Sequence, residues 1–280
     1  MRKVKLQVII DAVRDLCVEV NYNIPEDILS ALDACICSER NLSARDILKQ
    51  IYENALIAKK ENIPLCQDTG TANFFVQLGQ EVYIEDGSIY DAINRGVSLG
   101  YVGGYLRKSI VSDPLERRNT KDNTPANIYI DIVPGDKIEI TFLPKGGGSE
   151  NASALKMLTP SEGWDGVKDF VLNAVKDKGK NACPPLIIGV GIGGDFASVG
   201  LLSKKALLRK IGSVNENIIY AEKEKELFSE INELDIGPMG MGGDTTTLAV
   251  FVAVKPTHIA SLPVAVSIQC HSCRRKTVIL

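Results

Sequence analysis

Thiol, amide, carboxylate and hydroxyl side chains crowd into the segment Leu65-Cys66-Gln67-Asp68-Thr69-Gly70-Thr71-Ala72. The run 73–79 that follows is rich in aromatic and β-branched residues, which predicts a strand. Cys66 would therefore lie on the tight connection into that strand. A single cysteine is most often a buried and inert residue. Cys183 and Cys270, however, also lie at predicted strand boundaries beside Gly- or Pro-rich segments, so three thiols could converge on one point.

The spacing of the cysteines distinguishes between the kinds of metal site that they could form. Cys270-x-x-Cys273 suggests zinc, but structural zinc takes a second such pair or two histidines, and the chain has only His258 and His271. Three widely separated thiolates fit better a [4Fe–4S] cluster in which no protein side chain ligates one iron, since ordinary clusters have four cysteines. Such an open iron can bind a substrate carboxylate and hydroxyl and polarise the C–O bond. It would serve hydration or dehydration rather than electron transfer.

Three glycine-rich segments lie at 144–151, 191–195 and 237–247, and the first could bind an anion with its backbone amides. The first lacks the spacing of a Walker P-loop. Gly189-x-Gly191-x-x-Gly194 formally matches the dinucleotide fingerprint after a strand, but no acidic residue ends a second strand about twenty positions later. Because the glycine spacing still matches, a glycine-loop nucleotide-binding module is kept as an alternative function of a different class.

Apolar residues recur at helical spacing throughout residues 1–60, and Ser43 and Ser88 each resemble the first residue of a helical capping box. Segments 128–133 and 137–143 alternate around a Pro-Gly-Asp turn, which predicts an antiparallel hairpin. Further strands are expected at 186–190, 248–254 and 263–269, with helices between them. The predicted fold class is α+β: a helical N-terminal layer packed with a mixed β-sheet, and strand-end glycine loops around an iron–sulfur cluster.

Two other features have simpler interpretations. Cys17 and Cys35 fall on the apolar stripes of predicted helices, which indicates core positions, and Cys37 is an incidental neighbour. The polar stretch 111–125 is long for a connection without secondary structure, so it either has a function or is disordered. Its charges are typical of a solvated surface.

The composition is that of an ordinary globular protein: 280 residues, 45% hydrophobic and 24% charged, enough for one large domain or two small ones. No apolar run could span a bilayer, no cleavage site follows the basic start, and seven cysteines without a secreted scaffold favour reduced thiols. We therefore expect a cytoplasmic location. The net charge of −3 gives no attraction to nucleic acid, so local Arg and Lys must draw any anionic substrate.

Several motifs, in order along residues 1–275, resemble the alpha part of class I fumarate hydratases and the similar L-tartrate dehydratases. The motifs are Cys66-Gln67-Asp68-Thr69-Gly70-Thr71-Ala72, Asn119-Thr120-Lys121-Asp122-Asn123-Thr124-Pro125, Lys145-Gly146-Gly147-Gly148-Ser149-Glu150, Cys183-Pro184-Pro185 and Gly242-Gly243-Asp244-Thr245-Thr246. The resemblance implies an oxygen-labile [4Fe–4S] cluster held by Cys66, Cys183 and Cys270. Cys273 stands where the family does not require cysteine, which makes it a neighbour of the cluster.

The same resemblance implies the residues at the substrate: Gln67, Asp68, Arg107, Gly147, Gly148 and His258, with Asp68 and His258 as the catalytic pair. Arg107 could clamp one end of a dicarboxylate bidentately while backbone amides take other oxygens. Asp68, two residues from a cluster ligand, lies where a proton donor is wanted. His258 could instead only hydrogen-bond the cluster loop.

The sequence thus predicts one catalytic domain, 1–280, that is the cluster-bearing alpha subunit of a hydro-lyase and interconverts fumarate and L-malate. L-tartrate dehydration is the alternative within the class, and an iron–sulfur electron-transfer or sensor protein is another outside it. Related enzymes use a second, beta part, and only ten residues follow Cys270. We therefore expect a dicarboxylate substrate and a separate beta chain in an α2β2 assembly, with no nucleic-acid or membrane partner.

Overall fold

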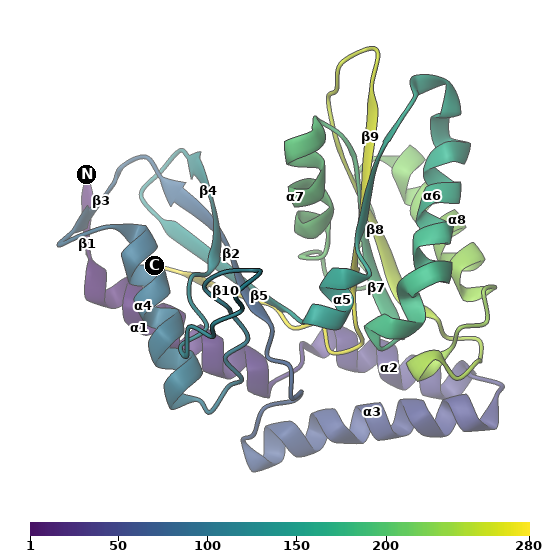
Figure 1. Ribbon diagram of the computed structural model, residues 1–280, viewed down its shortest axis with the longest axis horizontal. Helices are drawn as coiled ribbons and strands as arrows, with labels where there is room; N and C mark the ends of the chain where they lie inside the picture. Colours follow the sequence, from purple (N-terminus) through teal and green to yellow (C-terminus); the bar gives the residue numbers. More distant parts are fainter. The chain divides into compact units, whose positions relative to one another are not determined.

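The computed structural model describes residues 1–280 as two compact units, each assembled from separate stretches of the chain. Unit 1 comprises Met1–Pro25, Ala55–Gly147 and Cys273–Leu280, and unit 2 comprises Glu26–Asn54 and Gly148–Ser272. Each has its own sheet and helices (Figure 1), which confirms the predicted α+β class. The prediction of a single catalytic domain concerns function and stays a prediction.

Unit 1 is built on a four-stranded mixed sheet with the order β10-β5-β2-β4. Its strands are β2 (Thr71–Gly79), β4 (Asn127–Val133), β5 (Ile138–Lys145) and β10 (Lys276–Ile279). Helices α1 (Leu6–Tyr22) and α4 (Ile89–Gly103) pack on the sheet, and their apolar faces form one core with it. Cys17 is fully buried in this core, as predicted, and burial raises the pKa of its thiol.

Two sequence predictions about unit 1 are wrong. Residues 1–60 are not helical throughout, because Arg2–Lys5 forms strand β1, which pairs in parallel with β3 (Val82–Glu85). The predicted hairpin of β4 and β5 does not form either, because β2 lies between the two strands, parallel to β4 and antiparallel to β5. The Pro-Gly-Asp turn reverses the chain, but β2 takes the hydrogen bonds that a hairpin would use.

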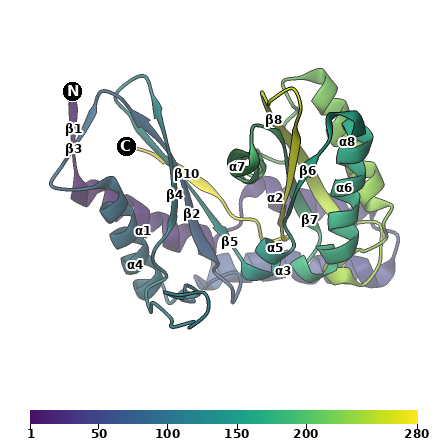
Figure 2. The ribbon, with the colours of Figure 1, turned by 45° about the horizontal axis from the view of Figure 1, so that its top comes forward.

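Unit 2 contains a second four-stranded sheet, with the order β6-β9-β7-β8. Its strands are β6 (Ala154–Leu158), β7 (Leu186–Gly193), β8 (Thr247–Lys255) and β9 (Leu262–Gln269). Figure 2 shows α6 (Gly163–Lys178) and α8 (Ile218–Asn232) on one side of this sheet and α7 (Phe196–Ala206) on the other. The core lies between the sheet and the α6–α8 pair.

Shorter or more peripheral elements complete the chain: α2 (Glu26–Ser38), α3 (Leu42–Glu61), α5 (Gly147–Asn151) and the 3-10 turns Pro160–Glu162, Gly179–Ala182 and Pro238–Gly240. The division between the units falls inside α3, between Asn54 and Ala55. None of the helices is both long enough and apolar enough to cross a membrane.

The glycines of β7 allow α7 to pack closely on the sheet. A Cβ atom at Gly189 would lie 2.2 Å from the Ser203 carbonyl oxygen, and one at Gly191 would lie 2.6 Å from that of Val199. Asp195 then caps α7 by accepting a hydrogen bond from the Ser198 amide at 2.8 Å. Helix–strand packing and capping therefore account for the glycine spacing that formally matches the dinucleotide fingerprint.

Side chains form hydrogen bonds with the backbone amides and carbonyls along the free edge of β8. The Val252 amide donates to Glu224 Oε1 at 2.8 Å, and Asn215 Nδ2 donates to the Val252 carbonyl at 2.9 Å. Asn232 accepts from the Thr247 amide at 2.9 Å and donates to its carbonyl at 3.4 Å. An open strand edge can pair with a strand of another chain, so these bonds protect this one.

Candidate functional site

The Cys66–Gly70 turn is fixed by hydrogen bonds to other segments of unit 1. The buried Thr69 hydroxyl donates to the Arg107 carbonyl at 3.0 Å, and the buried Tyr101 hydroxyl donates to the Thr69 carbonyl at 2.8 Å. Burial raises the pKa of Tyr101 well above its ordinary value, which keeps this hydroxyl protonated as a donor. The turn is thus attached at two points, to Tyr101 of α4 and to Arg107 in the chain that follows α4.

Gly70 is required by the backbone of this turn. Its φ of +71° is rarely adopted by other residues, and a Cβ atom would lie 2.6 Å from the Lys145 carbonyl carbon. Lys145 is the last residue of β5, and it pairs with Thr71 of β2. The turn therefore lies directly against the end of β5, from which Gly146 and Gly147 follow.

Both carboxylate oxygens of Asp68 accept backbone hydrogen bonds. The Gly70 amide donates to Oδ1 at 3.0 Å, and the Gly147 amide donates to Oδ2 at 2.8 Å. Arg274, whose side chain is only 3% exposed, donates through Nη2 to the Asp68 carbonyl at 3.2 Å. These bonds fix the direction of the Asp68 carboxylate. They also mean that the Gly147 amide, which the family resemblance places at the substrate, donates to Asp68 in this structure.

The predicted site residues of unit 1 therefore gather around one turn. Cys66 and Asp68 are half-buried, Gln67 is exposed, and the exposed Arg107 is joined to the turn through its carbonyl. Gly147 joins the group through its bond to Asp68. Of the predicted residues, Cys183, Gly148, His258 and Cys270 belong to unit 2.

Cys183 and Cys270 lie at the same end of the unit 2 sheet. Gln269, the last residue of β9, pairs with Ile187 near the start of β7, so Cys270 emerges where the chain from Cys183 enters the sheet. The His271 amide donates to the Cys183 carbonyl at 3.3 Å, and His271 Nδ1 lies 3.0 Å from the same oxygen. The antiparallel pairing of β7 and β9 thus brings two of the three predicted cysteines together.

The backbone at Cys183 is unusual, with a φ of +54° and a ψ of +67°. Left-handed backbone costs a residue other than glycine about 1–2 kcal/mol. Such conformations concentrate at functional sites, where the surrounding structure holds them. The Cys183 side chain is exposed, so its conformation presents the thiol at the surface of the unit.

Buried Gln269 connects α5 to the Cys270 segment. Its Oε1 accepts from the Ser149 hydroxyl at 2.9 Å and from the Cys270 amide at 3.4 Å. Cys270 Sγ lies 3.1 Å from the Ser272 hydroxyl. Gly148, whose backbone the family resemblance places at the substrate, directly precedes Ser149. The bond from Ser149 to Gln269 therefore holds Gly148 near the Cys270 end of the sheet.

His258 lies in the connection between β8 and β9, at the opposite end of β9 from Cys270. Its Nδ1 accepts from the Ala260 amide at 3.2 Å, and its carbonyl accepts from the Ser261 amide at 2.9 Å. The eight residues of β9 separate His258 from Cys270. At the usual rise per residue that strand spans about 26 Å. Within unit 2, His258 therefore does not meet the cysteine pair.

The cysteines fit an iron–sulfur group by their chemistry. None of the seven forms a disulfide, and Cys183 is exposed while Cys66 and Cys270 are half-buried, so all three predicted ligands are accessible. Cys273 is fully buried. No point in the structure has three or more His, Cys, Asp or Glu side chains gathered at metal-binding range. Thiolates are the ligands that iron–sulfur clusters require, so the donor set is suitable.

The glycine loop before β8 has a structural role in unit 2. The buried Glu39 carboxylate, just after α2, accepts four hydrogen bonds of 2.9–3.1 Å from the Asn41, Asp244 and Thr245 amides and the Thr245 hydroxyl. Hydrogen bonding to Arg40 lowers the pKa of Asp244 to about 2.

The half-buried Cys35 lines a pocket of about 700 Å³ beside this loop.

The sequence did not indicate the residues that support the Cys66–Gly70 turn. Asn123 is fully buried; it accepts from the Ser109 amide at 2.7 Å and donates to the Gly70 carbonyl at 3.1 Å. It lies inside a recognised motif, so the resemblance indicated the segment but not this role. Tyr101 lies on the apolar stripe of a helix and Arg274 in a basic pair, and neither pattern distinguishes a supporting residue from an ordinary one.

Comparison with known proteins shows the family of the chain. Residues 10–279 match the family model described as fumarate hydratase (fumerase). The "Putative L(+)-tartrate dehydratase subunit alpha" of Methanocaldococcus jannaschii is 43% identical over 271 residues, which cover 95% of each chain. The L(+)-tartrate dehydratase subunit alpha of Escherichia coli O157:H7 is 33% identical over 265 residues, or 93% of this chain and 87% of that protein. The chain therefore belongs to the fumarate hydratase family and is a hydro-lyase.

Proposed function

We propose that this chain is the cluster-bearing alpha subunit of an enzyme that reversibly hydrates fumarate to L-malate. The observation that carries the proposal is the Asp68 carboxylate, which two backbone amides hold two residues from a half-buried thiol. Addition of water across a double bond needs a proton-transfer group fixed in direction beside the group that activates the substrate. The match to the fumarate hydratase family model supports fumarate as the substrate.

Cys66, Cys183 and Cys270 are the proposed ligands of a [4Fe–4S] cluster with one iron not ligated by protein. When bound, that cluster supplies a Lewis acid that polarises the substrate carboxylate and hydroxyl. The support is the accessibility of the three thiols and the joining of Cys183 and Cys270 through His271. Cys273 is not a proposed ligand, because its side chain is buried.

The remaining residues bind the substrate and move its proton. Arg107 is proposed to bind one carboxylate of the dicarboxylate bidentately, and Gln67 to donate a hydrogen bond to it. Asp68 exchanges the proton at the substrate carbon. The Gly147 and Gly148 amides are proposed to bind substrate oxygens, and for Gly147 this requires sharing with or exchange from Asp68 Oδ2.

His258 is proposed to act on the substrate of a second copy of the chain. The resemblance assigns it to the substrate, while β9 separates it from Cys270 of its own unit. A histidine in an exposed, hydrogen-bonded turn is suited to reach into another chain. Together with a separate beta chain, this favours an α2β2 assembly, because two-fold symmetry lets each copy complete the other. A cytoplasmic location is part of the same proposal.

L-tartrate dehydration is the second candidate function. Its support is specific: both relatives described above are named as tartrate dehydratase alpha subunits, one of them 43% identical. The two substrates are dicarboxylates that differ by one hydroxyl group, so the same proposed residues serve both.

The test is anaerobic reconstitution of the alpha chain with iron, sulfide and the beta chain, followed by assays with fumarate and with L-tartrate. We expect turnover of one of them by the complex and little by the alpha chain alone. Turnover of neither, or equal turnover without the beta chain, would contradict the proposal.

Cysteine variants test the cluster ligands. We expect Cys66→Ser, Cys183→Ser and Cys270→Ser each to lose most of the bound iron, because each removes one of three thiolates. Cys37→Ser, which removes an exposed thiol from α2, is the matched control and should retain iron. Iron content per chain is the measurement, and retention of full iron by any of the three variants would remove that cysteine from the ligand set.

A further inference from the structure

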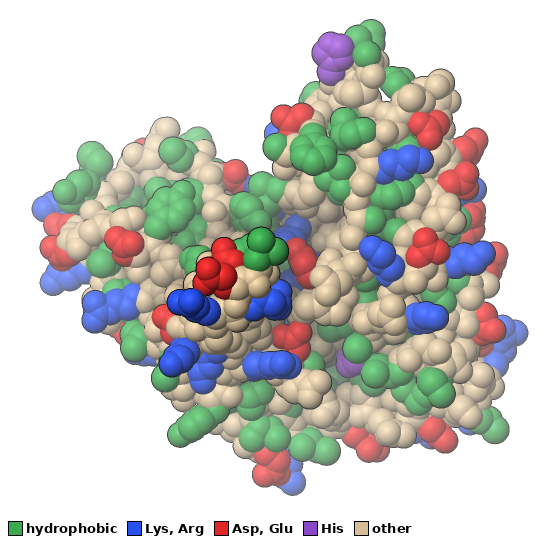
Figure 3. Space-filling view, viewed as in Figure 1, with side chains coloured by type: hydrophobic (Ala, Val, Ile, Leu, Met, Phe, Trp, Pro, Cys, Tyr) green, Lys and Arg blue, Asp and Glu red, His purple; other side chains and the backbone are tan.

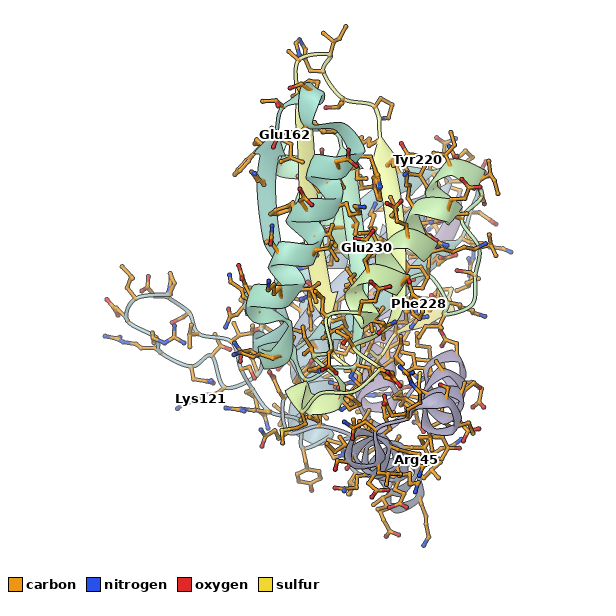
Figure 4. The ribbon with its side chains drawn as sticks, turned by 90° about the vertical axis from the view of Figure 1, so that its right-hand side faces the viewer. Arg45, Lys121, Glu162, Tyr220, Phe228 and Glu230 are labelled. Carbon is orange, nitrogen blue, oxygen red and sulfur yellow. The ribbon has the colours of Figure 1, made fainter.

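The polar stretch that the sequence left without a role forms a basic hairpin, defined here as residues 107–122. Val111 and Asn119 pair across it, the Ser112 amide donates to the Arg118 carbonyl at 2.7 Å, and the Thr120 amide donates to the Ile110 carbonyl at 3.0 Å. The stretch 111–125, for which the sequence left disorder open, is therefore ordered in this structure. In Figure 4 the hairpin, on which Lys121 is labelled, extends away from the helices and strands.

The base of the basic hairpin is attached to the turn that carries Cys66 and Asp68. The Arg107 carbonyl accepts from the Thr69 hydroxyl at 3.0 Å at one end of the hairpin. Beyond the other end, Asn123 bonds both the Ser109 amide and the Gly70 carbonyl. The hairpin thus begins and ends at the candidate site of unit 1.

Cations dominate the charge of the basic hairpin. It holds five basic and three acidic side chains, a net charge of +2 in a chain whose net charge is −3. All three acidic groups are engaged locally. Asp113 accepts from the Leu115 and Glu116 amides, and Glu116 pairs with Arg118 at 3.3 Å. Asp122 accepts from the Thr124 amide and hydroxyl. Arg107, Arg117, Arg118 and Lys121 are exposed.

The backbone holds these cations in unusual conformations. Arg117 has a φ of +58° and Lys121 a φ of +70°, and Asn123 at the base has +65°. Side chains other than glycine seldom adopt this region, and where they do it is commonly part of a functional site. In Figure 3, Lys and Arg side chains gather around the hairpin.

We propose that the basic hairpin attracts the dianionic substrate and delivers it to Arg107, through the exposed cations Arg117, Arg118 and Lys121. This rests on the proposed function and adds how the substrate reaches that site. A chain of net negative charge repels a dicarboxylate as a whole, so a local positive field beside the site raises the rate of encounter. The effect is electrostatic and acts over a Debye length, about 10 Å at 0.1 M salt, so it weakens as salt is added.

The test compares two triple variants in the reconstituted complex with the beta chain. The hairpin variant is Arg117→Gln/Arg118→Gln/Lys121→Gln, and the control is Lys5→Gln/Lys59→Gln/Lys60→Gln, which removes the same charge from exposed positions elsewhere in unit 1. At low ionic strength we expect the hairpin variant to lose about tenfold in kcat/KM with kcat unchanged, against less than about twofold for the control. At 0.5 M salt the two should agree, and the hairpin variant should show the flatter salt dependence.

Each other outcome overturns the inference. Equal kcat/KM for the two variants at low salt would show that the hairpin does not attract substrate, while wild-type turnover would leave the proposed function intact. Loss of the beta chain from the hairpin variant during co-purification would show a docking surface instead. If the wild-type complex turns over neither dicarboxylate, the proposed function fails. The hairpin and control variants are then compared by their affinity for fumarate, measured by calorimetry, instead of by kcat/KM. Equal affinities, or no binding, would then overturn the inference as well.

Discussion

Backbone groups, rather than opposing side-chain charges, set the position of the Asp68 carboxylate. It accepts two amide hydrogen bonds, one from its own turn and one from Gly147, and its carbonyl accepts a third from Arg274. An orientation fixed in this way depends on the backbone path of the Cys66–Gly70 turn. The residue most sensitive to change in that path is Gly70.

Gly70→Ala tests this dependence. Left-handed backbone alone costs alanine about 1–2 kcal/mol, and the contact of 2.6 Å with Lys145 adds to it, so we expect unfolding free energy to fall by at least 2 kcal/mol. Gly103→Ala is the control, because nothing lies within 4 Å of a Cβ atom there and the residue ends α4. It should be neutral or stabilising by about 0.5–1 kcal/mol. Denaturant unfolding measures both, and equal stabilities would show that the turn tolerates a side chain.

The sequence indicated which residues of the turn carry chemistry but not which ones support it. Cys66, Gln67 and Asp68 are recognisable because thiol, amide and carboxylate are grouped next to a strand. Tyr101 and Asn123 support the turn through its backbone carbonyls, from positions 32 and 53 residues away along the chain. A hydrogen bond between a side chain and a distant backbone carbonyl depends on the tertiary structure, so no local sequence pattern predicts it.

At the scale of elements, helix starts illustrate the same limit. Ser88 caps α4 as predicted, accepting from the Tyr90 amide at 3.2 Å. The predicted cap at Ser43 is wrong, because Asn41 Oδ1 accepts from the Ser43 and Ala44 amides at 3.0 and 3.2 Å. Serine and asparagine are nearly equal as caps, so the sequence alone could not choose between positions two residues apart.

The glycines of β7 give a prediction about how this element packs. Gly189→Ala places a Cβ atom against the Ser203 carbonyl, so α7 must move and we expect a loss of about 3 kcal/mol in unfolding free energy. Gly200→Ala on α7 is the control, since its nearest neighbour would be 4.0 Å away.

The same glycines formally match the dinucleotide fingerprint, and we expect NAD titration of the wild-type chain to show no binding. Saturable NAD binding, abolished by Gly191→Ala, would restore the nucleotide interpretation.

At the scale of the whole molecule, the α+β class was predictable while the division into two units was not. Strand and helix periods are local signals, so most elements were found close to their observed bounds. Which strands pair is decided by distant segments: β2 lies between β4 and β5, and the short strand β10 pairs with β5. Such pairings leave no spacing in the sequence that local reasoning could use.

The proposed action of His258 on a second copy predicts complementation between inactive chains. Cys270→Ser alpha chains lack a cluster ligand and His258→Ala chains lack the histidine, so each alone should be nearly inactive. Mixed before assembly with the beta chain, random pairing of two alpha copies should restore about one quarter of wild-type activity, since half of the pairs contain one complete site.

Sedimentation of the mixed complex should be unchanged from wild type, which controls for assembly. Failure of the mixture to exceed the sum of the separate variants would show that His258 acts within its own chain or not on the substrate.

Each four-stranded sheet is completed by a strand that comes after β8 in the sequence, so the order of synthesis constrains the order of folding. In unit 1, β10 pairs with β5, and the Arg2 guanidinium donates to the Leu280 carbonyl at 2.8 Å. In unit 2, β9 lies between β6 and β7. A protein of two contiguous domains can fold the first while the ribosome still synthesises the second. Here each four-stranded sheet includes a strand that follows nearly all the other elements in the sequence, so β5, β6 and β7 each keep an unpaired edge until β9 and β10 have been synthesised.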